Sequence, residues 1–395
     1  MRAPDPGRLV LAVLLLLQAA AGVPVAAPAR FDAATFAPLV EHGIRIGAYP
    51  GAALVVGRRD TVLFSGGYGH LTWSAQSGAV SPDRTLYDIA SMTKVVATTT
   101  ALMILLDRGR VRLDDPVRAY IPEFQGEGTE RITLRMLLNH TSGLASGDTS
   151  LPHAADAAAA MRRVYAATPR VTPGTRVIYS DLNAILAGEI ARRASGESLD
   201  AFAAREILEP LGMTETRFRP PRTETARTAP TNLWHGHPIA GLVNDPSAAR
   251  LGGVSGNAGL FSTAADLARF AQFILRAGVT ADGRRLVRAA TVALFTTRSA
   301  WFGGVTEARG LGWQMTPTGE ATSSAGSLFG ARSFGHTGFT GTSIWIDPDR
   351  DLFVILLTNR AFAPRARRPF TELKRVRGAV ADAAARASDA GSNGR

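Results

Sequence analysis

The sequence predicts an α+β fold, in which helices flank an antiparallel β-sheet and a mostly helical subdomain is inserted between the strands. Two strand-like runs near the start of the chain, residues 52–56 and 61–65, have counterparts near its end, residues 342–346 and 352–358. Residues 95–330 lie between them and have mainly helical patterns of apolar side chains. We therefore expect segments from both ends of the chain to share one sheet, with the middle of the chain packed against it.

Short polar turns join the members of each strand pair. Gly-Arg-Arg-Asp at residues 57–60 follows the first strand, and Asp-Pro-Asp-Arg at residues 347–350 separates the last two. Turn residues of these types between apolar runs predict hairpins. Residues 352–358 are apolar almost throughout, which is typical of a central strand covered on both faces.

Several helices are marked by apolar spacing and by their end signals. The run 95–106 is apolar on nearly every side and ends before Gly109, as expected of a helix buried in a core. Residues 182–190 have apolar side chains at helical spacing, and residues 199–208 end before a proline. For residues 264–277, Thr263 supplies the predicted N-cap.

The two ends of the chain differ from the rest. Arg2 and Arg8 precede an apolar run and then small residues, which is typical of an export signal at residues 1–27. An uncleaved membrane anchor is the alternative, because the apolar stretch approaches the ~20 residues that a spanning helix needs. We expect one globular domain over residues 33–365, and a basic C-terminal helix and tail over residues 366–395. The protein is expected to be exported to the periplasm or beyond, or tethered to the inner membrane.

Composition excludes several classes of partner and site. The chain has a formal net charge of +11 and no cysteine, so it has no disulfides, no cysteine metal ligands and no lipid on an N-terminal cysteine. Its arginines are mostly scattered singly and in pairs without interleaved aromatic residues, and we expect no nucleic-acid partner. Such a surface remains compatible with anionic cell-wall polymers or lipid head groups.

The most informative stretch is Ser91-Met92-Thr93-Lys94, which opens the buried run. Ser91 and Lys94 are three residues apart on a helix, so the hydroxyl and the ammonium can meet within hydrogen-bond distance. Burial and the positive end of the helix dipole should lower the pKa of Lys94 and make it a proton acceptor for Ser91. Only two of the 44 basic residues are lysines, and arginine cannot release its proton in this way.

Two further stretches are candidates for the same site. Tyr179 stands before the predicted helix at residue 182, where a neighbouring cation would favour its phenolate form as a base. Ser180 or Asp181 can equally serve only to cap that helix. The glycine-rich stretch 334–341 runs into a strand, where a free N–H could form part of an oxyanion hole; a plain strand with bulges is the alternative.

Other motifs favour ordinary structural roles. The glycine-rich residues 252–259 match no phosphate-binding or dinucleotide fingerprint and predict a loop. His140 is expected to be a turn residue that holds its loop, because the chain has no G-x-S-x-G nucleophile elbow. His235 and His237 lack a third ligand nearby, so we predict no metal site and no cofactor.

Together these stretches resemble the three motifs of the serine β-lactamase and penicillin-binding-protein-like superfamily, most closely its class C-like branch. The motifs occur in the expected order: Ser91 with Lys94, Tyr179 with Ser180 and Asp181, and His336 with Thr337 and Gly338. Residues 132–144, 211–213 and 310–313 also resemble that branch, and the similarity covers about residues 33–360. The resemblance implies the β-lactamase/transpeptidase-like fold.

The resemblance also implies an acyl-serine hydrolase. Ser91 would attack a carbonyl, Lys94 and Tyr179 would move the proton, and the backbone N–H groups of Ser91 and Phe339 would hold the oxyanion. Asp181, His336, Thr337 and Gly338 would contact the substrate. Ser180 is the alternative base, because Ser180-Asp181 also resembles the Ser-Asp-Asn motif of other members.

Departures from the branch pattern bear on the substrate. Asp181 stands where asparagine is usual, and His336 where many members have lysine. We expect His336 to bind a substrate carboxylate less well as its charge is lost near its ordinary pKa of about 6.5.

Residues 334–342 and 252–262 resemble a subgroup acting on cell-wall fragments, so we expect cleavage of an amide or peptide bond in a small-molecule or muropeptide substrate, as by a D,D-carboxypeptidase or muramyl-peptide amidase. A carboxylesterase, a β-lactamase and a non-catalytic penicillin-binding receptor are the alternatives.

Overall fold

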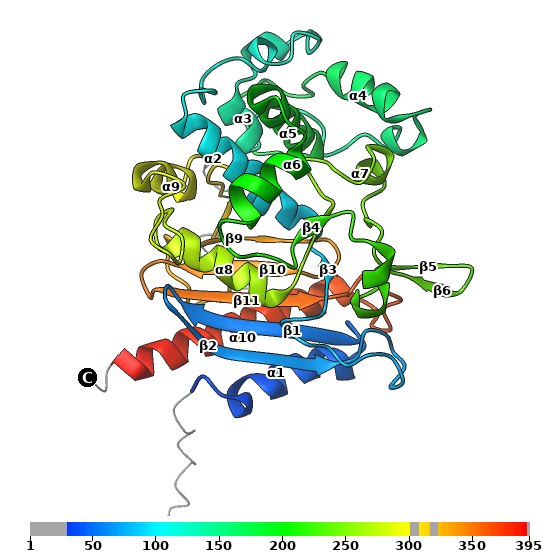
Figure 1. Ribbon diagram of the computed structural model, residues 1–395, viewed down its shortest axis with the longest axis vertical. Coiled ribbons are helices and arrows are strands. Elements are labelled where there is room, and N and C mark those ends of the chain that lie inside the picture. The colour runs from blue at the N-terminus through cyan, green and yellow to red at the C-terminus, as the bar shows by residue number, and fades with distance from the viewer. Residues whose placement is uncertain (1–29, 301–307, 317–322, 393–395) are drawn as a thin grey trace, which may run out of the picture.

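The computed structural model describes residues 30–300, 308–316 and 323–392 and has the predicted α+β architecture. The predicted export signal at 1–27 lies outside the described residues. A six-stranded antiparallel sheet has the order β2-β1-β11-β10-β9-β8 (Figure 1). The strands span Thr61–Gly69 (β2), Gly51–Arg58 (β1), Leu352–Thr358 (β11), Ser343–Asp347 (β10), Phe334–Thr337 (β9) and Gln314–Met315 (β8).

Both predicted hairpins are confirmed, and they join in the middle of the sheet. β1 pairs with β11 in antiparallel register, with Ala52 opposite Thr358. Every residue of β11 is buried, as expected of a central strand. The N-terminal and C-terminal hairpins therefore complete one sheet.

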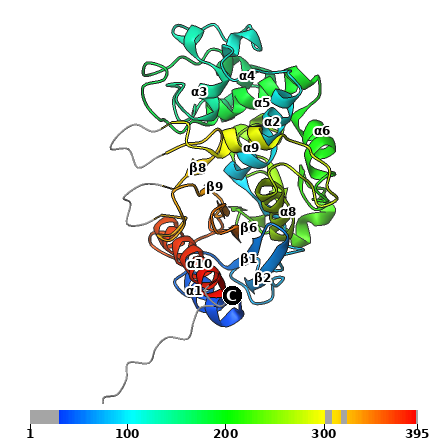
Figure 2. The same cartoon turned by 90° about the vertical axis from the view of Figure 1, so that its left-hand side faces the viewer.

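Helices cover both faces of this sheet because its central strands are apolar on both sides. On β1, Ala53 and Val55 belong to one core cluster, whereas Leu54 and Val56 belong to another. Helices α1 (Ala33–Arg45) and α10 (Pro369–Ser392) pack together on the second face, and α8 (Ala264–Leu275) packs on the first (Figure 2).

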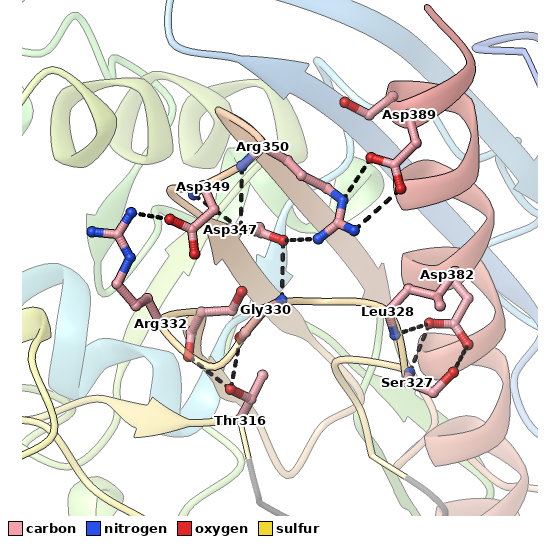
Figure 3. A network of polar contacts seen from close by, with 12 residues as sticks. Thr316, Ser327, Leu328, Gly330, Arg332, Asp347, Asp349, Arg350, Asp382 and Asp389 are labelled. Atoms are coloured by element: carbon pink, nitrogen blue, oxygen red, sulfur yellow. Dashed lines mark hydrogen bonds and ion pairs between the residues drawn. The ribbon is translucent and has the colours of Figure 1, made fainter. Parts of the chain in front are cut away.

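Helix α10 belongs to the body of the fold. Leu373, Val376 and Val380 on it are buried against the sheet. Figure 3 shows how polar contacts reinforce this packing: the Asp382 carboxylate accepts hydrogen bonds from the N–H groups of Ser327 and Leu328. Arg350, in the turn before β11, pairs with Asp389 of α10.

The middle of the chain forms the helical subdomain above the sheet (Figure 1). Its helices are α2 (Thr100–Asp107), α3 (Leu134–Leu138), α4 (Ala157–Tyr165), α5 (Asp181–Ser195), α6 (Leu199–Ala203), α7 (Pro246–Arg250) and α9 (Ala289–Thr296). Short strands β3 (Tyr87–Asp88), β7 (Leu260–Ser262) and β4 (Arg217–Phe218) form a small sheet, and β5 (Asn232–Trp234) pairs with β6 (His237–Ile239).

The buried helix that follows the serine is less regular than predicted. A 3₁₀ turn, Ala90–Met92, is followed by a π-helical segment, Lys94–Thr99, before α2 begins. The Thr98 hydroxyl donates to the carbonyl of Gly256, 2.8 Å away, so this wider turn is held by a contact from outside the helix. Segments of π-helix are often found at functional sites. Residues 90–107 have the length and hydropathy of a membrane span, but 83% of this stretch is buried, and it forms the core of the subdomain.

Candidate active site

Ser91 is presented by a strained turn between the small sheet and the buried helix. Ala90, immediately before it, has a φ of 47°, a conformation that few residues with a side chain adopt. The N–H of Ala90 donates to the Asp88 carboxylate at 2.8 Å. Strained backbone of this kind is frequent where a reactive side chain must be presented.

Lys94 makes the contact with Ser91 that its spacing predicts. Its Nζ donates to Ser91 Oγ at 2.9 Å and to the carbonyl oxygen of Asn257 at 3.0 Å. The same nitrogen forms an ion pair with Asp181 Oδ1 at 2.7 Å, and only 4% of the lysine side chain is exposed. The 252–259 stretch is a loop, as predicted, and it also supplies the carbonyl that orients Lys94.

The expected lowering of the Lys94 pKa is wrong. Burial does act in the predicted direction, but the electrostatic interactions and hydrogen bonds with Tyr179 and Asp181 outweigh it, and the pKa of Lys94 is raised. Lys94 is therefore an ammonium at neutral pH, and it donates to Ser91 Oγ.

Tyr179 lies at the centre of a cluster of charged and aromatic groups. Lys94 Nζ is 5.0 Å from the centre of its ring, and the guanidinium of Arg309 is 5.1 Å away. The rings of His140 and His336 are 4.7 and 6.1 Å from the Tyr179 ring, centre to centre. Two cations next to one phenol are suited to holding negative charge on its oxygen.

Ser180 and Asp181 occupy different positions at the start of α5. Ser180 is the N-cap: its hydroxyl donates to the carbonyl of Ala145 at 2.5 Å and accepts from the N–H of Asn183 at 3.4 Å. It is fully buried. Asp181 begins the helix, with one oxygen on Lys94 and 33% of its side chain exposed. The capping interpretation therefore fits Ser180, whereas Asp181 faces the site.

His140 holds the segment that carries Tyr179, as its assignment to a turn predicts. Its φ is 60°, and its Nδ1 accepts a hydrogen bond from the N–H of Ser180 at 3.1 Å. Burial, together with the nearby Arg309 and Lys94 charges, puts the pKa of His140 well below 6.5. The ring is thus neutral and fixes the start of α5.

His336 is placed near Tyr179 but does not carry a charge. It lies on β9 opposite Ile344 and is 3% exposed, and its Nδ1 is 2.9 Å from the carbonyl oxygen of Thr337. Burial and the charges of Lys94 and Arg309 put the pKa of His336 well below 6.5. The expectation that His336 loses a charge in the physiological range is therefore wrong, because the charge is already absent.

Among the described residues, β8 pairs with only part of β9 beside His336. β8 pairs with β9 at Phe334 and Gly335 only, which leaves His336 and Thr337 beyond the end of that pairing. The turn that follows fits tightly against the nucleophile segment: a Cβ on Gly338 would lie 2.5 Å from the carbonyl oxygen of Ile89. A glycine is required at 338 for this approach.

Phe339 follows Gly338 at the surface. Its side chain is 63% exposed. The guanidinium of Arg360 donates to its carbonyl oxygen and lies 4.8 Å from the centre of its ring. Arg360 thus holds Phe339 through the peptide that follows it, whereas the predicted oxyanion N–H belongs to the peptide that precedes it.

Sequence reasoning missed Arg309, although it directly precedes the recognised stretch at 310–313. The residue is 4% exposed. Its guanidinium lies 5.1 Å from the centre of the Tyr179 ring, and its charge lowers the pKa of His140 and of His336. One arginine among 42 carries no local signal of this position. Over the described residues, no group of three His, Cys, Asp or Glu side chains could hold a metal ion.

Comparisons with known proteins identify the family of the chain. A family model described as Beta-lactamase matches residues 36–376. A relative from Escherichia coli K12, provisionally named D-alanyl-D-alanine carboxypeptidase, is 35% identical over 71% of this chain and 70% of its own length. One of the same name from Escherichia coli O157:H7 is 32% identical over 80% of both chains.

Solved structures have the same fold. A penicillin-binding protein homologue from Caulobacter crescentus has a TM-score of 0.70 at 22% identity, covering 89% of this chain and 97% of its own. EstCE1, a hydrolase with promiscuous acyltransferase activity, has a TM-score of 0.71 at 21% identity, covering 88% and 98%. The extent of the family match and the identity to these relatives show that the chain belongs to the beta-lactamase family of serine hydrolases.

Proposed function

We propose that the protein is an exported acyl-serine hydrolase that cleaves an amide or peptide bond in a peptidoglycan-derived substrate, as a D,D-carboxypeptidase or muramyl-peptide amidase does. The observation that carries this proposal is the position of Lys94 Nζ, 2.9 Å from Ser91 Oγ, 2.7 Å from Asp181 and 5.0 Å from the Tyr179 ring centre. The names of the curated relatives support the substrate class.

In the proposed acylation step, Tyr179 acts as a phenolate: Ser91 Oγ forms a bond to the substrate carbonyl carbon, the carbonyl oxygen becomes the oxyanion, and the Ser91 proton passes to the phenolate oxygen of Tyr179. Lys94 remains an ammonium and donates to Oγ, so it orients the nucleophile. The N–H groups of Ser91 and Phe339 hold the oxyanion. When the C–N bond breaks, Tyr179 returns the proton to the leaving amine, and water then hydrolyses the acyl-serine.

Arg309 supports a substrate that carries a carboxylate. His336 is neutral, and Arg309 provides a permanent positive charge beside Tyr179. A peptide that ends in D-alanine brings its terminal carboxylate close to the scissile bond. The positive charge of Arg309 therefore favours a peptide substrate with a terminal carboxylate over a neutral ester.

The test compares kcat/KM of the full chain for three substrates: a muropeptide ending in D-Ala-D-Ala, a nitrophenyl ester and a chromogenic β-lactam. We expect the muropeptide to be turned over most efficiently, and all turnover to disappear in Ser91→Ala. A larger kcat/KM for the ester would make the protein a carboxylesterase. Acylation of Ser91 without repeated turnover would make it a receptor.

We propose export because residues 1–27 have the sequence pattern of an export signal. If this signal is not cleaved, it would instead tether the protein to the membrane. A fusion of residues 1–40 to a reporter that is active only outside the cytoplasm should be active. Cleavage releases the reporter into the soluble fraction, whereas an anchor keeps it with the membrane. An inactive fusion would overturn the proposal.

A further inference from the structure

We propose that Asp88 is a positioning residue. It fixes the turn at Ala90, which presents Ser91, relative to the segment 244–257, in which the Asn257 carbonyl binds Lys94. The inference rests on the proposed function, because it takes Ser91 as the nucleophile. Asp88 lies at the end of β3, does not contact Ser91 Oγ, and acts through backbone groups on both sides of the site. The sequence analysis did not identify it.

Each oxygen of the Asp88 carboxylate binds a different segment. Oδ1 accepts from the N–H of Ala90 at 2.8 Å, and Oδ2 accepts from the N–H of Asn244 at 2.7 Å. The residue is 1% exposed. A buried carboxylate shared by two amides is a rigid bridge between them.

The first contact stabilises the turn that presents Ser91. Ala90 has a φ of 47°, which is unfavourable for a residue with a Cβ. Its N–H points at Asp88 in this conformation, so the hydrogen bond offsets the cost of the left-handed backbone. Without this bond, Ala90 is free to relax and to carry Ser91 with it.

The second contact reaches Lys94 through a chain of hydrogen bonds. Asn244 is followed by Asp245, whose Oδ1 accepts from Asn257 Nδ2 at 3.2 Å. The carbonyl oxygen of Asn257 accepts from Lys94 Nζ at 3.0 Å. The position of the Lys94 ammonium thus depends on the loop that Asp88 holds.

A third contact ties the same residue to the proposed oxyanion turn. The Thr340 hydroxyl donates to the backbone carbonyl of Asp88 at 2.7 Å, next to Phe339. Asp88 therefore links the nucleophile, the Lys94 loop and the turn after β9. Removal of its charge should alter the relative positions of the reacting groups more than the stability of the fold.

Ionisation of Asp88 gives the bridge a pH dependence. Burial raises the pKa of Asp88 to about 6; the N–H groups of Asn244 and Ala90 lower it, and the neighbouring charge of Asp245 raises it. Below that pH one oxygen carries a proton and faces an N–H group, which weakens the bridge. Acylation should therefore decline as the pH falls through about 6.

The experiment measures the rate of Ser91 acylation by a fluorophosphonate in Asp88→Asn, with Asp266→Asn as the matched control. Asp266 on α8 is also a buried carboxylate that accepts a backbone N–H, but its partners Glu215, Thr216 and Arg269 are not among the proposed site residues. We expect a ~10- to 100-fold slower acylation in Asp88→Asn only. The acid limb near pH 6 should disappear in Asp88→Asn and remain in the control.

A second substitution separates positioning from loss of stability. Glycine adopts a positive φ without strain, so Ala90→Gly in the Asp88→Asn background should restore part of the acylation rate. Equal rates in Asp88→Asn and wild type, or a loss that Ala90→Gly leaves unchanged, would overturn the inference. Failure of wild-type Ser91 to be labelled would instead overturn the proposed function, so the two failures are distinguishable.

Discussion

At the scale of single residues, long-range neighbours set the charge states of the site. The S-x-x-K spacing correctly predicts that Ser91 and Lys94 meet. It could not predict that Asp181, 87 positions further along the chain, binds the ammonium and raises the pKa of Lys94. Arg309 was missed for the same reason. Asp88 is close to Ser91 in sequence, but its role depends on the contact with Asn244, which is distant in sequence.

Lys94→Arg should lower kcat/KM by ~10²- to 10³-fold. Lys94 Nζ lies within hydrogen-bond distance of Ser91, Asn257 and Asp181 in a pocket that leaves 4% of the side chain exposed. A planar guanidinium keeps the charge but cannot occupy the same point. Lys374→Arg, the same change at the other lysine, should leave kcat/KM unaltered. A fully active Lys94→Arg would show that the site needs only a positive charge.

His336 should make the protein less stable in acid. The unfolded chain gains a proton at His336 below pH ~6.5, whereas the folded pKa lies well below this value. The unfolded state therefore binds more protons. His336 should lower the free energy of unfolding by up to about 1.4 kcal/mol for each unit by which the pH is lowered. His336→Asn should reduce the slope by this amount in denaturant titrations between about pH 6.5 and 5 and leave the contribution of the neutral His140, whereas the exposed His237→Asn should leave the slope unchanged. An equal slope in His336→Asn would contradict the neutral assignment.

At the scale of elements, sequence patterns predicted α5, α8, α10 and both hairpins, because their apolar spacing is local, but they did not predict α1. They did not predict the π-helical turn at Lys94–Thr99, which depends on a contact between Thr98 and the loop at Gly256. β8 was also missed, since two residues are too few to give a periodic pattern.

Gly338→Ala should lower both the activity and the stability of the protein, because it displaces the turn after β9. The added Cβ would lie 2.2 Å from Thr342 Oγ1 and 2.5 Å from the carbonyl oxygen of Ile89, so the turn must move away from the nucleophile segment. We expect ~10- to 100-fold lower kcat/KM and a loss of about 1–3 kcal/mol in the free energy of unfolding. Gly391→Ala is the control, because its Cβ would meet open space. Unchanged kinetics in Gly338→Ala would mean that this turn does not shape the site.

At the scale of the whole molecule, α10 connects the far end of the chain to both the sheet and the loop at residues 326–328. Asp382 binds the N–H groups of Ser327 and Leu328 and the Ser327 hydroxyl (Figure 3). Asp382→Ala should reduce the free energy of unfolding by about 1–3 kcal/mol, because these donors lose their acceptor. Chemical denaturation measures this loss. Arg375→Ala, which removes an exposed pair on the same helix, should change it by less than about 1 kcal/mol.

The pairing of β1 with β11 also governs when the protein can fold. Ala52 is opposite Thr358, so the centre of the sheet cannot form before nearly the whole chain has been synthesised. Contacts so distant in sequence make folding slow, since a very long loop must close first. A ribosome-bound chain that lacks β11 therefore cannot complete the central sheet. For a protein proposed to be exported, this delay keeps the polypeptide in a form that can thread through a translocation channel.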